Sequence, residues 1–351
     1  GGIYLRDFKL STLNNCNLTN HIIDNNAGGG IYMNNAKSND ITVIIKQVSG
    51  LNSDGLGIYL NTDSDNNNLD VNISGCTNTT SMAWGYGGGI FLDGADYNTI
   101  EGIIHRNRFT DCGAGIALDN NANYNTLNAD VLENTLDLNG YPAFGGGIYI
   151  GGSYNTVNSD VISNKSGTGG GIGFWEGDNN TVNGEIAYNM TFDKGLSYPG
   201  SGMGGGIIFY KSDNNLVYSE IYSNINASNQ GGGIGFIYSR DNNISASCHI
   251  RNNMVNGLGA GIAFYGGTSS PDSTGNIISA LIYDNYSTED GGAISMSSDK
   301  VHDNIIDGVV SNNHADRYGG GVVLYDSGAN TFSGKFVNNS SGTRGGGFYI
   351  R

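Results

Sequence analysis

The stretch from Asn155 to Phe174 reads NTVNSDVISNKSGTGGGIGF and contains the pattern that decides the fold. Two asparagines, Asn155 and Asn164, stand nine residues apart with aliphatic residues at fixed positions between them. A run of glycines then leads into Ile172, after which apolar and small residues alternate. Alternation at a period of two is typical of a β-strand, so this stretch predicts short strands joined by tight turns.

The same pattern recurs along the whole chain. Glycine runs followed by an apolar residue occur from Gly1 to Gly345, at intervals that average about 29 residues. Each repeat is too short to bury its own apolar face, and stacked repeats share one core. Gly is 58 of the 351 residues, and at a corner glycine permits a positive φ or a very close approach of two backbones.

The paired asparagines predict two ladders of stacked side chains. A stacked asparagine can bond to its own backbone and to the amide of the next coil, which satisfies polar groups that a turn leaves unpaired. The asparagines that open a repeat are Asn98, Asn125, Asn155, Asn180, Asn215, Asn276, Asn304 and Asn330, and those that close it are Asn107, Asn134, Asn164, Asn189, Asn224, Asn285, Asn313 and Asn339. Earlier repeats open at Cys16, Asn39 and Asn67, and the repeat from Asn243 carries one extra residue, which suggests a bulge.

These features predict an all-β fold, a right-handed parallel β-helix of about 12 coils of about 29 residues each. Helix formers are scarce, which argues against a helical repeat. The gap between paired asparagines is constant while the gap to the next glycine run varies, so loops of variable length are expected along one edge. Residues 1–351 form one predicted domain, part of a longer solenoid or of an end-to-end assembly, because both ends stand at the same phase of the repeat.

The composition describes an ordered and acidic chain. Only 3 residues are Pro and 38% are hydrophobic, whereas disordered chains are rich in Pro and poor in apolar residues. The net charge of −16 repels phosphate backbones, so nucleic acid is not an expected partner. No apolar run approaches the length that spans a bilayer, so membrane insertion is not expected either. The first residue is Gly and no signal peptide is visible, which indicates a processed chain or an excerpt.

The repeats resemble those of a known family. Phe336-x-x-Asn339 followed by Gly345-Gly346-Gly347-Phe348 resembles the FxxN and GGA[ILV] repeats of the polymorphic outer-membrane protein (Pmp-like) adhesins. The resemblance covers essentially the whole chain, with an aliphatic residue in the first position of most coils and a third Gly where the family has Ala. It implies a secreted β-helical passenger used in adhesion, and fold alone does not imply function.

An acidic column is the most distinct charged feature. The sixth position of the asparagine element is acidic in four successive coils, at Asp130, Asp160, Glu185 and Glu220. Stacked carboxylates about 5 Å apart repel each other, bind a cation such as Ca²⁺, or form the acid pair of a glycosidase. A solvated stripe, a calcium site and a catalytic pair therefore remain as alternatives for this column.

Asp63 and Asp65 form a second candidate calcium site, because alternate oxygen ligands follow each other in a short loop. A plain polar turn is the alternative, since the loop lacks the glycine and distal glutamate of an EF-hand. No other metal or organic cofactor is expected. The four cysteines fit no metal or redox spacing, so buried thiols are expected, with a Cys76–Cys112 bridge as the alternative.

An aromatic stripe is predicted on the outer face of the strand that follows each glycine run. Such a stripe can contact a sugar or a partner, or it can stabilise the sheet by stacking between coils. Its members are Tyr4, Tyr32, Tyr59, Phe91, Tyr149 and Tyr349. Among many Asn-x-Ser/Thr sequences, Asn78 and Asn226 are expected in loops and would be the glycosylation acceptors of an extracellular chain.

The sequence as a whole favours an extracellular structural or adhesive β-solenoid, a cell-surface or filament-forming protein without catalytic activity. The expected partners are other copies of the chain, bound end to end or laterally, or cell-surface glycans. Two alternatives stay open. One is a carbohydrate-active enzyme, a polysaccharide hydrolase or lyase, that uses Asp130, Asp160, Glu185 and Glu220. The other is a glycan-binding module.

Overall fold

The computed structural model describes residues 2–24, 26–78, 85–137, 143–192, 202–228, 230–267 and 272–351. Throughout these residues the chain is all-β without a helix, and its parallel strands stack as a β-solenoid of about 12 turns that lie about 28 residues apart. The predicted fold class is confirmed, with a slightly shorter coil than expected. By its contacts the chain divides into a first unit, Gly1–Ser166, and a second unit, Gly167–Arg351, which are described separately.

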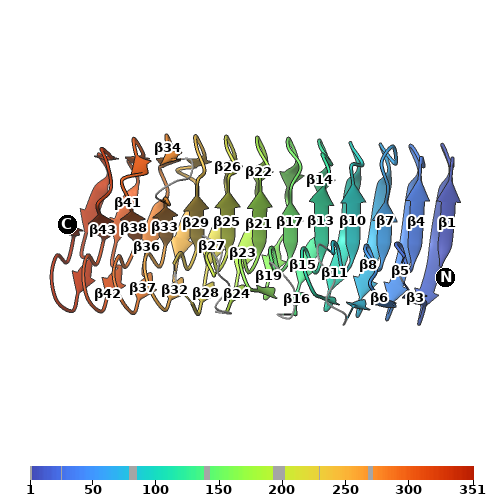
Figure 1. Ribbon diagram of the computed structural model, residues 1–351, viewed down its shortest axis with the longest axis horizontal. Helices are drawn as coiled ribbons and strands as arrows, with labels where there is room; N and C mark the ends of the chain where they lie inside the picture. Colours follow the sequence, from blue (N-terminus) through green and yellow to red (C-terminus); the bar gives the residue numbers. More distant parts are fainter. Residues whose placement is uncertain are drawn as a thin grey trace. The chain divides into compact units, whose positions relative to one another are not determined.

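The first sheet contains the strand that follows each glycine run. Isoleucine leads most of these strands because its branched side chain suits a pleated and half-buried surface. Figure 1 shows the strands of each unit side by side. In the first unit they are β1 (Ile3–Arg6), β4 (Ile31–Asn34), β7 (Ile58–Leu60), β10 (Ile90–Asp93), β13 (Ile116–Asp119) and β17 (Ile148–Ile150). In the second unit they are β21 (Ile172–Trp175), β25 (Ile207–Tyr210), β29 (Ile234–Ile237), β33 (Ile262–Tyr265), β38 (Ile294–Ser297), β43 (Val322–Tyr325) and β47 (Phe348–Ile350).

The second sheet carries the asparagine element, and after the first four coils a small bend divides each strand in two. In the first unit it contains β2 (Thr12–Thr19), β5 (Asp40–Lys46), β8 (Asn68–Ser74), β11 (Thr99–His105), β14 (Thr126–Leu127), β15 (Asp130–Leu132), β18 (Thr156–Val157) and β19 (Val161–Ile162). In the second unit it contains β22 (Thr181–Val182), β23 (Glu185–Ala187), β26 (Leu216–Val217), β27 (Glu220–Tyr222), β30 (Asn243–Ile244), β31 (His249–Arg251), β35 (Ile277–Ile278), β36 (Leu281–Tyr283), β40 (Ile305–Ile306), β41 (Val309–Ser311), β44 (Thr331–Phe332) and β45 (Lys335–Val337).

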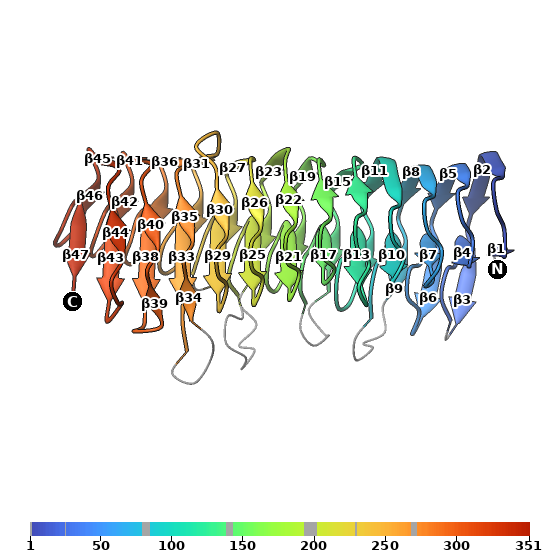
Figure 2. The ribbon, with the colours of Figure 1, turned by 90° about the horizontal axis from the view of Figure 1, so that it is seen from above.

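The third sheet follows the closing asparagine and is seen from another side in Figure 2. Its strands in the first unit are β3 (Ile22–Asp24), β6 (Ser49–Leu51), β9 (Thr77–Asn78), β12 (Arg108–Phe109), β16 (Thr135–Leu136) and β20 (Lys165–Ser166). In the second unit they are β24 (Met190–Thr191), β28 (Ile225–Asn226), β32 (Met254–Val255), β37 (Tyr286–Ser287), β42 (His314–Ala315) and β46 (Ser340–Ser341). A separate pair, β34 (Ser273–Thr274) and β39 (Val301–His302), lies beside the second unit's coils.

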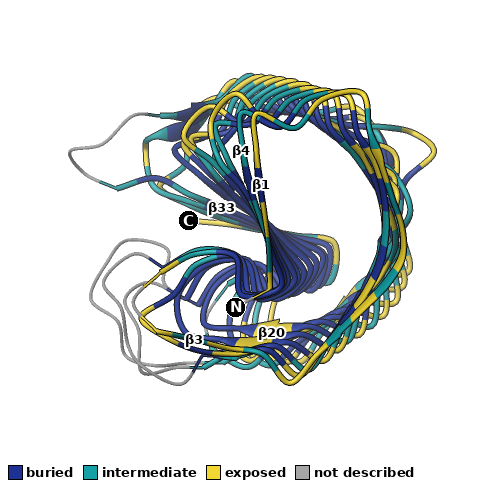
Figure 3. Cartoon of the chain, turned by 90° about the vertical axis from the view of Figure 1, so that its right-hand side faces the viewer, coloured by how far each residue is buried: buried dark blue, intermediate teal, exposed yellow. Residues whose placement is uncertain are grey.

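Like residues stack on like residues in the core of each unit. In the first unit Ile31, Ile58 and Ile90 pair in register along β4, β7 and β10, and all three are fully buried. In the second unit four phenylalanines form a continuous stack, with neighbouring ring centres 4.8 to 5.2 Å apart: Phe174, Phe209, Phe236 and Phe264. Figure 3 shows buried residues along the inner side of the coils and exposed residues along their outer contour. Burial of aliphatic and aromatic columns is therefore what holds the coils together.

The asparagine ladders are present as predicted. Oδ1 of Asn125 accepts the main-chain N–H of Asn98 at 2.8 Å, and Oδ1 of Asn134 accepts that of Asn107 at 3.0 Å. Two predicted positions were wrong. The ladder passes through Asn242 rather than Asn243, because two residues are inserted further along that coil, around Ser245 and Ser247. The first coil joins its ladder through Ser11, whose amide donates to Asn39, whereas Cys16 pairs within the sheet with Val43.

The run from Gly87 to Gly89 shows why glycine is favoured at its first and third positions. Gly87 begins its run with a φ of 69°, where a side chain would be strained and its Cβ would lie 2.4 Å from the carbonyl oxygen of Ile90. The third glycine, Gly89, has no room for a Cβ, which would lie 2.5 Å from the carbonyl oxygen of Gly115 in the next coil. The glycine runs are therefore structural, as the sequence predicted.

Candidate functional site

The predicted acidic column begins in the first unit with Asp130 and Asp160. These residues lie one coil apart on the outer face of the second sheet, and the main-chain oxygen of Asp160 accepts the N–H of Val131 at 2.8 Å. Partial burial raises the pKa of Asp130, and the charge of Asp160 raises it further. Two stacked carboxylates therefore repel each other here, as expected from the spacing.

The column's second half lies in the second unit, where other side chains of that unit bind both carboxylates. Glu185 and Glu220 pair in register, the hydroxyl of Tyr222 donates to Oε2 of Glu185 at 2.9 Å, and Nη2 of Arg251 lies 3.2 Å from Oε2 of Glu220. The guanidinium of Arg251 also lies 4.2 Å above the ring of Tyr222. Sequence analysis missed Arg251, although a residue two positions after the column residue points to the same face of a strand.

The acidic column and Tyr149 lie on different sheets. Tyr149 belongs to β17 of the first sheet and is only 5% exposed. Glu185 and Glu220 instead belong to strands of the second sheet and are held by side chains of their own unit. In the second unit the column contains one ion pair, at Glu220, and one hydrogen-bonded carboxylate, Glu185, and in the first unit it is a part-exposed acidic pair.

The predicted calcium loop holds a lysine. Nζ of Lys37 lies 2.9 Å from Oδ2 of Asp65 and 3.5 Å from Oδ1 of Asp63. The second oxygen of Asp65 accepts the main-chain N–H of Asp96 at 3.0 Å. Across the described residues, no group of three or more His, Cys, Asp or Glu side chains is placed to hold a metal ion. The chain's own ammonium group therefore occupies the position that the loop pattern suggested for a cation.

The predicted aromatic stripe is divided by burial. Tyr4, Tyr32 and Tyr59 stack along β1, β4 and β7, with ring centres 5.3 and 5.1 Å apart, and Tyr4 is 56% exposed. Phe91 and Tyr149 were predicted on the outer face but are buried, so they are not available as contact residues.

Aromatic residues that precede the glycine runs cover the buried part of the stripe. Tyr86 packs against both Phe91 and Tyr149, and Phe144 packs against Tyr149. Tyr349, in the second unit, is part-buried against Tyr318, with ring centres 4.6 Å apart. Only Tyr4, Tyr32 and Tyr59 of the predicted stripe therefore form an accessible row within the first unit.

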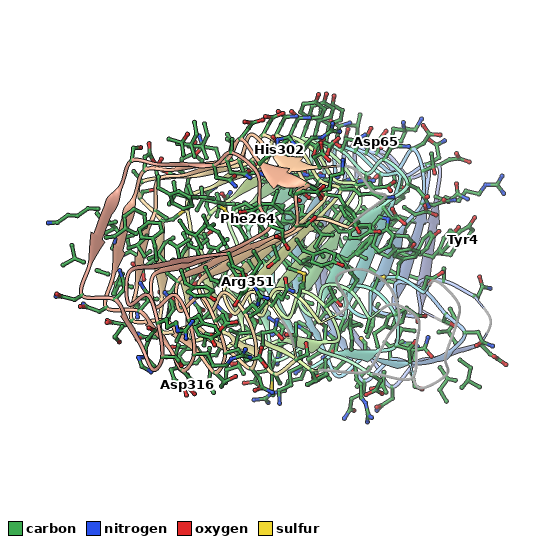
Figure 4. All side chains as sticks on the ribbon, turned by 60° about the vertical axis from the view of Figure 1, so that its left-hand side comes forward. Tyr4, Asp65, Phe264, His302, Asp316 and Arg351 are labelled. Atoms are coloured by element: carbon green, nitrogen blue, oxygen red, sulfur yellow. The ribbon has the colours of Figure 1, made fainter. Side chains whose placement is uncertain are left out.

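The accessible row of Tyr4, Tyr32 and Tyr59 is here called the tyrosine groove, because a hollow opens at its Tyr4 end. Asp54 lies one coil after Ala27 and is bridged to it. The hollow has a volume of about 440 Å³ and is lined by Gly2, Ile3, Tyr4, Ile23, Asn26, Ala27, Gly28 and Tyr32. Figure 4 labels Tyr4, which projects from the surface. This volume is within the range of small-ligand sites.

Carboxylates lie near Tyr59, at the other end of the tyrosine groove. The hydroxyl of Tyr59 donates to Asp93, whose other oxygen accepts Nδ2 of Asn120 at 2.6 Å. Oδ1 of Asp54 accepts the main-chain N–H of Tyr86 at 2.8 Å, and burial raises the pKa of Asp54 to about 6. The charge of Asp93 adds to that rise. Sequence analysis did not identify these groups, because the two aspartates are 39 positions apart and no motif joins them.

The predicted glycosylation acceptors are not on loops. Asn78 and Asn226 are fully buried strand residues. Nδ2 of Asn78 donates to the carbonyl of Ser53 at 3.2 Å, and Nδ2 of Asn226 donates to that of Gly202 at 2.7 Å. The prediction of surface acceptors is wrong at both positions, because each side-chain amide donates to a main-chain carbonyl inside the coil.

The four cysteines are free thiols, so the alternative Cys76–Cys112 bridge is not formed. Cys76, Cys112 and Cys248 are buried, as predicted.

Comparison with family models, with curated protein sequences and with solved structures finds no match for this chain. The described residues contain no helix with the length and apolar character to cross a bilayer. The fold alone defines a class, the parallel β-solenoids, and members of one fold class differ in function through their surface sites.

Proposed function

We propose that this chain is an adhesive β-solenoid that binds a glycan in the tyrosine groove of its first unit. The observation that carries the proposal is the hollow of about 440 Å³, whose lining combines Tyr4 and Tyr32 with the amide of Asn26. Aromatic rings supply apolar contact with a polar hydroxyl at one end, and amides both donate and accept hydrogen bonds. A sugar presents the complementary mixture of C–H groups and hydroxyls.

Two further features support a binding role. The tyrosines are set on stacked strands whose side chains cannot rearrange freely, so little ordering is needed when a ligand enters. Repetition of the same side chain in successive coils also suits a ligand that is itself a repeating polymer. The resemblance of the repeats to Pmp-like adhesins points to the same role at the cell surface, which remains part of the proposal.

A direct test uses an array of defined neutral and acidic glycans, followed by titration calorimetry with the glycan that binds best. Tyr32→Ala removes one of the side chains that line the hollow, and we expect glycan binding to weaken by at least tenfold. Tyr188→Ala is the control, because Tyr188 is a surface tyrosine, 56% exposed, that lies in the second unit. Equal binding by wild type and Tyr32→Ala would refute the assignment of the groove.

The tyrosine groove also favours a second candidate function, hydrolysis of the bound glycan. Asp54 has a raised pKa and interacts electrostatically with Asp93, which accepts hydrogen bonds from Tyr59 and Asn120. Most glycoside hydrolases use two carboxyl groups in different environments, one as the general acid and the other as the nucleophile or base. New reducing ends released by the wild type and absent with Asp54→Asn would support hydrolysis. Tight binding without cleavage would leave adhesion as the function.

A further inference from the structure

A second surface of the first unit repeats the same side chains in three successive coils. The sequences Tyr97–Glu101, Tyr124–Asn128 and Tyr154–Asn158 each place a tyrosine, a threonine and an acid or amide at alternate positions. The threonines pair in register, and the aliphatic residues between them are buried. We call the nine outer side chains the tyrosine–threonine platform: Tyr97, Thr99, Glu101, Tyr124, Thr126, Asn128, Tyr154, Thr156 and Asn158.

The tyrosines of the platform form an exposed ladder. Their ring centres are 5.0 Å apart at both steps, and the rings are parallel within 4° and 9°. The residues are 54%, 46% and 51% exposed. Because the rings stack on one another, the ladder presents ring edges and hydroxyl groups rather than ring faces to the outside, one set for each coil.

The backbone at these tyrosines is unusual for a bulky residue. Tyr97, Tyr124 and Tyr154 have φ values of 58°, 58° and 60°, in the left-handed region. Most other described coils place residues that tolerate this region at the same position: Ser38, Asn66, Asn179, Asn214, Asp241, Gly275 and Asp303. Leu10 in the first coil, with a φ of 49°, is an exception. A tyrosine in this conformation opposes its local preference, and such conflicts are expected where function selects the side chain.

The platform is held in place from beneath. Each tyrosine is followed by a ladder asparagine, and Oδ1 of Asn125 and of Asn155 accepts the main-chain N–H of the asparagine one coil earlier at 2.8 Å. On the surface, Nδ2 of Asn158 donates to Oδ1 of Asn128 at 2.8 Å. The polar groups of the platform are therefore fixed at the spacing of the coils before any partner binds, which lowers the entropy that binding must overcome.

The charge of the platform restricts its partner. Eight of its nine side chains are uncharged, although the chain carries a net charge of −16. Asp130 and Asp160 follow on the same outer face and would repel an anionic polymer. Hydroxyl and amide groups both donate and accept hydrogen bonds, as sugar hydroxyls do. In an extended β-linked glycan, successive sugar rings are spaced at nearly the interval that separates these coils.

We propose that the tyrosine–threonine platform binds the surface of an insoluble, neutral, extended polysaccharide, in which successive sugar rings along each chain repeat the spacing of the coils. The platform is separate from the tyrosine groove, so this inference does not depend on glycan binding in the groove. A polymer surface suits it better than a single short sugar, because the same side chains repeat over three coils, and a hollow of about 510 Å³ lined in part by Thr99 and Glu101 opens beside the first of them.

The test measures depletion of the protein from solution by washed microcrystalline cellulose and by chitin. Tyr124→Asn is the chosen variant because asparagine already occupies the same backbone conformation at Asn66 and Asn179, so folding is expected to be retained. We expect the wild type to bind at least one of the two polymers, and Tyr124→Asn to weaken that binding by at least tenfold. Tyr32→Ala, which alters only the groove, is expected to bind the polymer as the wild type does.

Circular dichroism and the melting temperature check that each variant is folded. If the wild type binds neither polymer, or if Tyr124→Asn binds as the wild type does, the proposal is refuted. Sedimentation velocity tests the alternative occupant, a second copy of the chain. A wild type that dimerises while Tyr124→Asn stays monomeric would identify the platform as a protein interface and would also overturn the proposal.

Discussion

Removal of one ladder asparagine is the sharpest test of what stabilises the coils. Asn125 is fully buried and lies in the middle of the first unit's opening ladder. Its Oδ1 accepts the main-chain N–H of Asn98 at 2.8 Å and Nδ2 of Asn98 at 3.2 Å. Its Nδ2 donates to the carbonyl of Ala95 at 3.0 Å and to Oδ1 of Asn155 at 3.2 Å. Asn125→Ala removes all four hydrogen bonds at once.

The expected loss follows from the groups left without partners. The N–H of Asn98 and the carbonyl of Ala95 remain buried, and an unsatisfied buried polar group costs about 1–3 kcal/mol. Two such groups give an expected destabilisation of about 4 kcal/mol for Asn125→Ala, since each lies near the middle of that range. Asn125→Asp keeps the acceptor Oδ1 but replaces the Nδ2 donor with a second acceptor and buries a charge, so it is also expected to destabilise the first unit.

The assay is guanidinium unfolding followed by circular dichroism, together with hydrogen exchange at the amide of Asn98. Exchange is included because repeat proteins can open locally instead of unfolding in one step. Asn128→Ala is the matched control in the same coil, since an exposed side chain is expected to change stability by no more than about 0.5 kcal/mol. Unfolding free energies of the two variants within about 1 kcal/mol of each other would refute the ladder's role.

Two other predictions concern the core and the groove. Phe236→Ala opens the phenylalanine stack of the second unit and is expected to cost about 3–5 kcal/mol, measured by guanidinium unfolding against Tyr218→Ala, an exposed control. Asp54 has a folded pKa of about 6, above its ordinary value of 3.8, so the folded protein binds this proton more tightly than the unfolded chain does. Its contribution to stability is therefore complete below about pH 4 and is lost as the pH rises to about 6, at about 1.4 kcal/mol for each pH unit between the two values. Melting temperatures from pH 4 to pH 8 should fall less steeply for Asp54→Asn than for the wild type, and parallel curves would show that Asp54 does not titrate in this way.

The fold could be predicted because every coil repeats the same local rules. The alternation of residues after the glycine runs predicted the strands, and the paired asparagines predicted the ladders. Both patterns involve residues that are close in sequence. Errors arose where the repeat is irregular. The coil that contains Asn242 carries two inserted residues, and the first coil uses Ser11 in place of an asparagine. Composition alone does not show which of two adjacent asparagines enters a ladder.

The candidate sites were predictable only in part. Tyr4, Tyr32 and Tyr59 were identified from their spacing, and the structure places them in an accessible row. The ion pair between Arg251 and Glu220 was missed because it joins neighbouring coils. The stacked Tyr97, Tyr124 and Tyr154 were also missed, although each directly precedes a ladder asparagine, and that position is a signal that could have found them.

The sequence by itself therefore determined the coil, its strands and its ladders, because a repeat imposes the same hydrogen bonds and apolar contacts on each turn. Tertiary structure alone decided which outward side chains reach solvent. Phe91 and Tyr149 occupy the same position in the repeat as Tyr4, yet Tyr86, from the segment before a glycine run, covers them. The exposure of an outward side chain depends on which other side chains pack against it. The repeat pattern alone does not show those contacts.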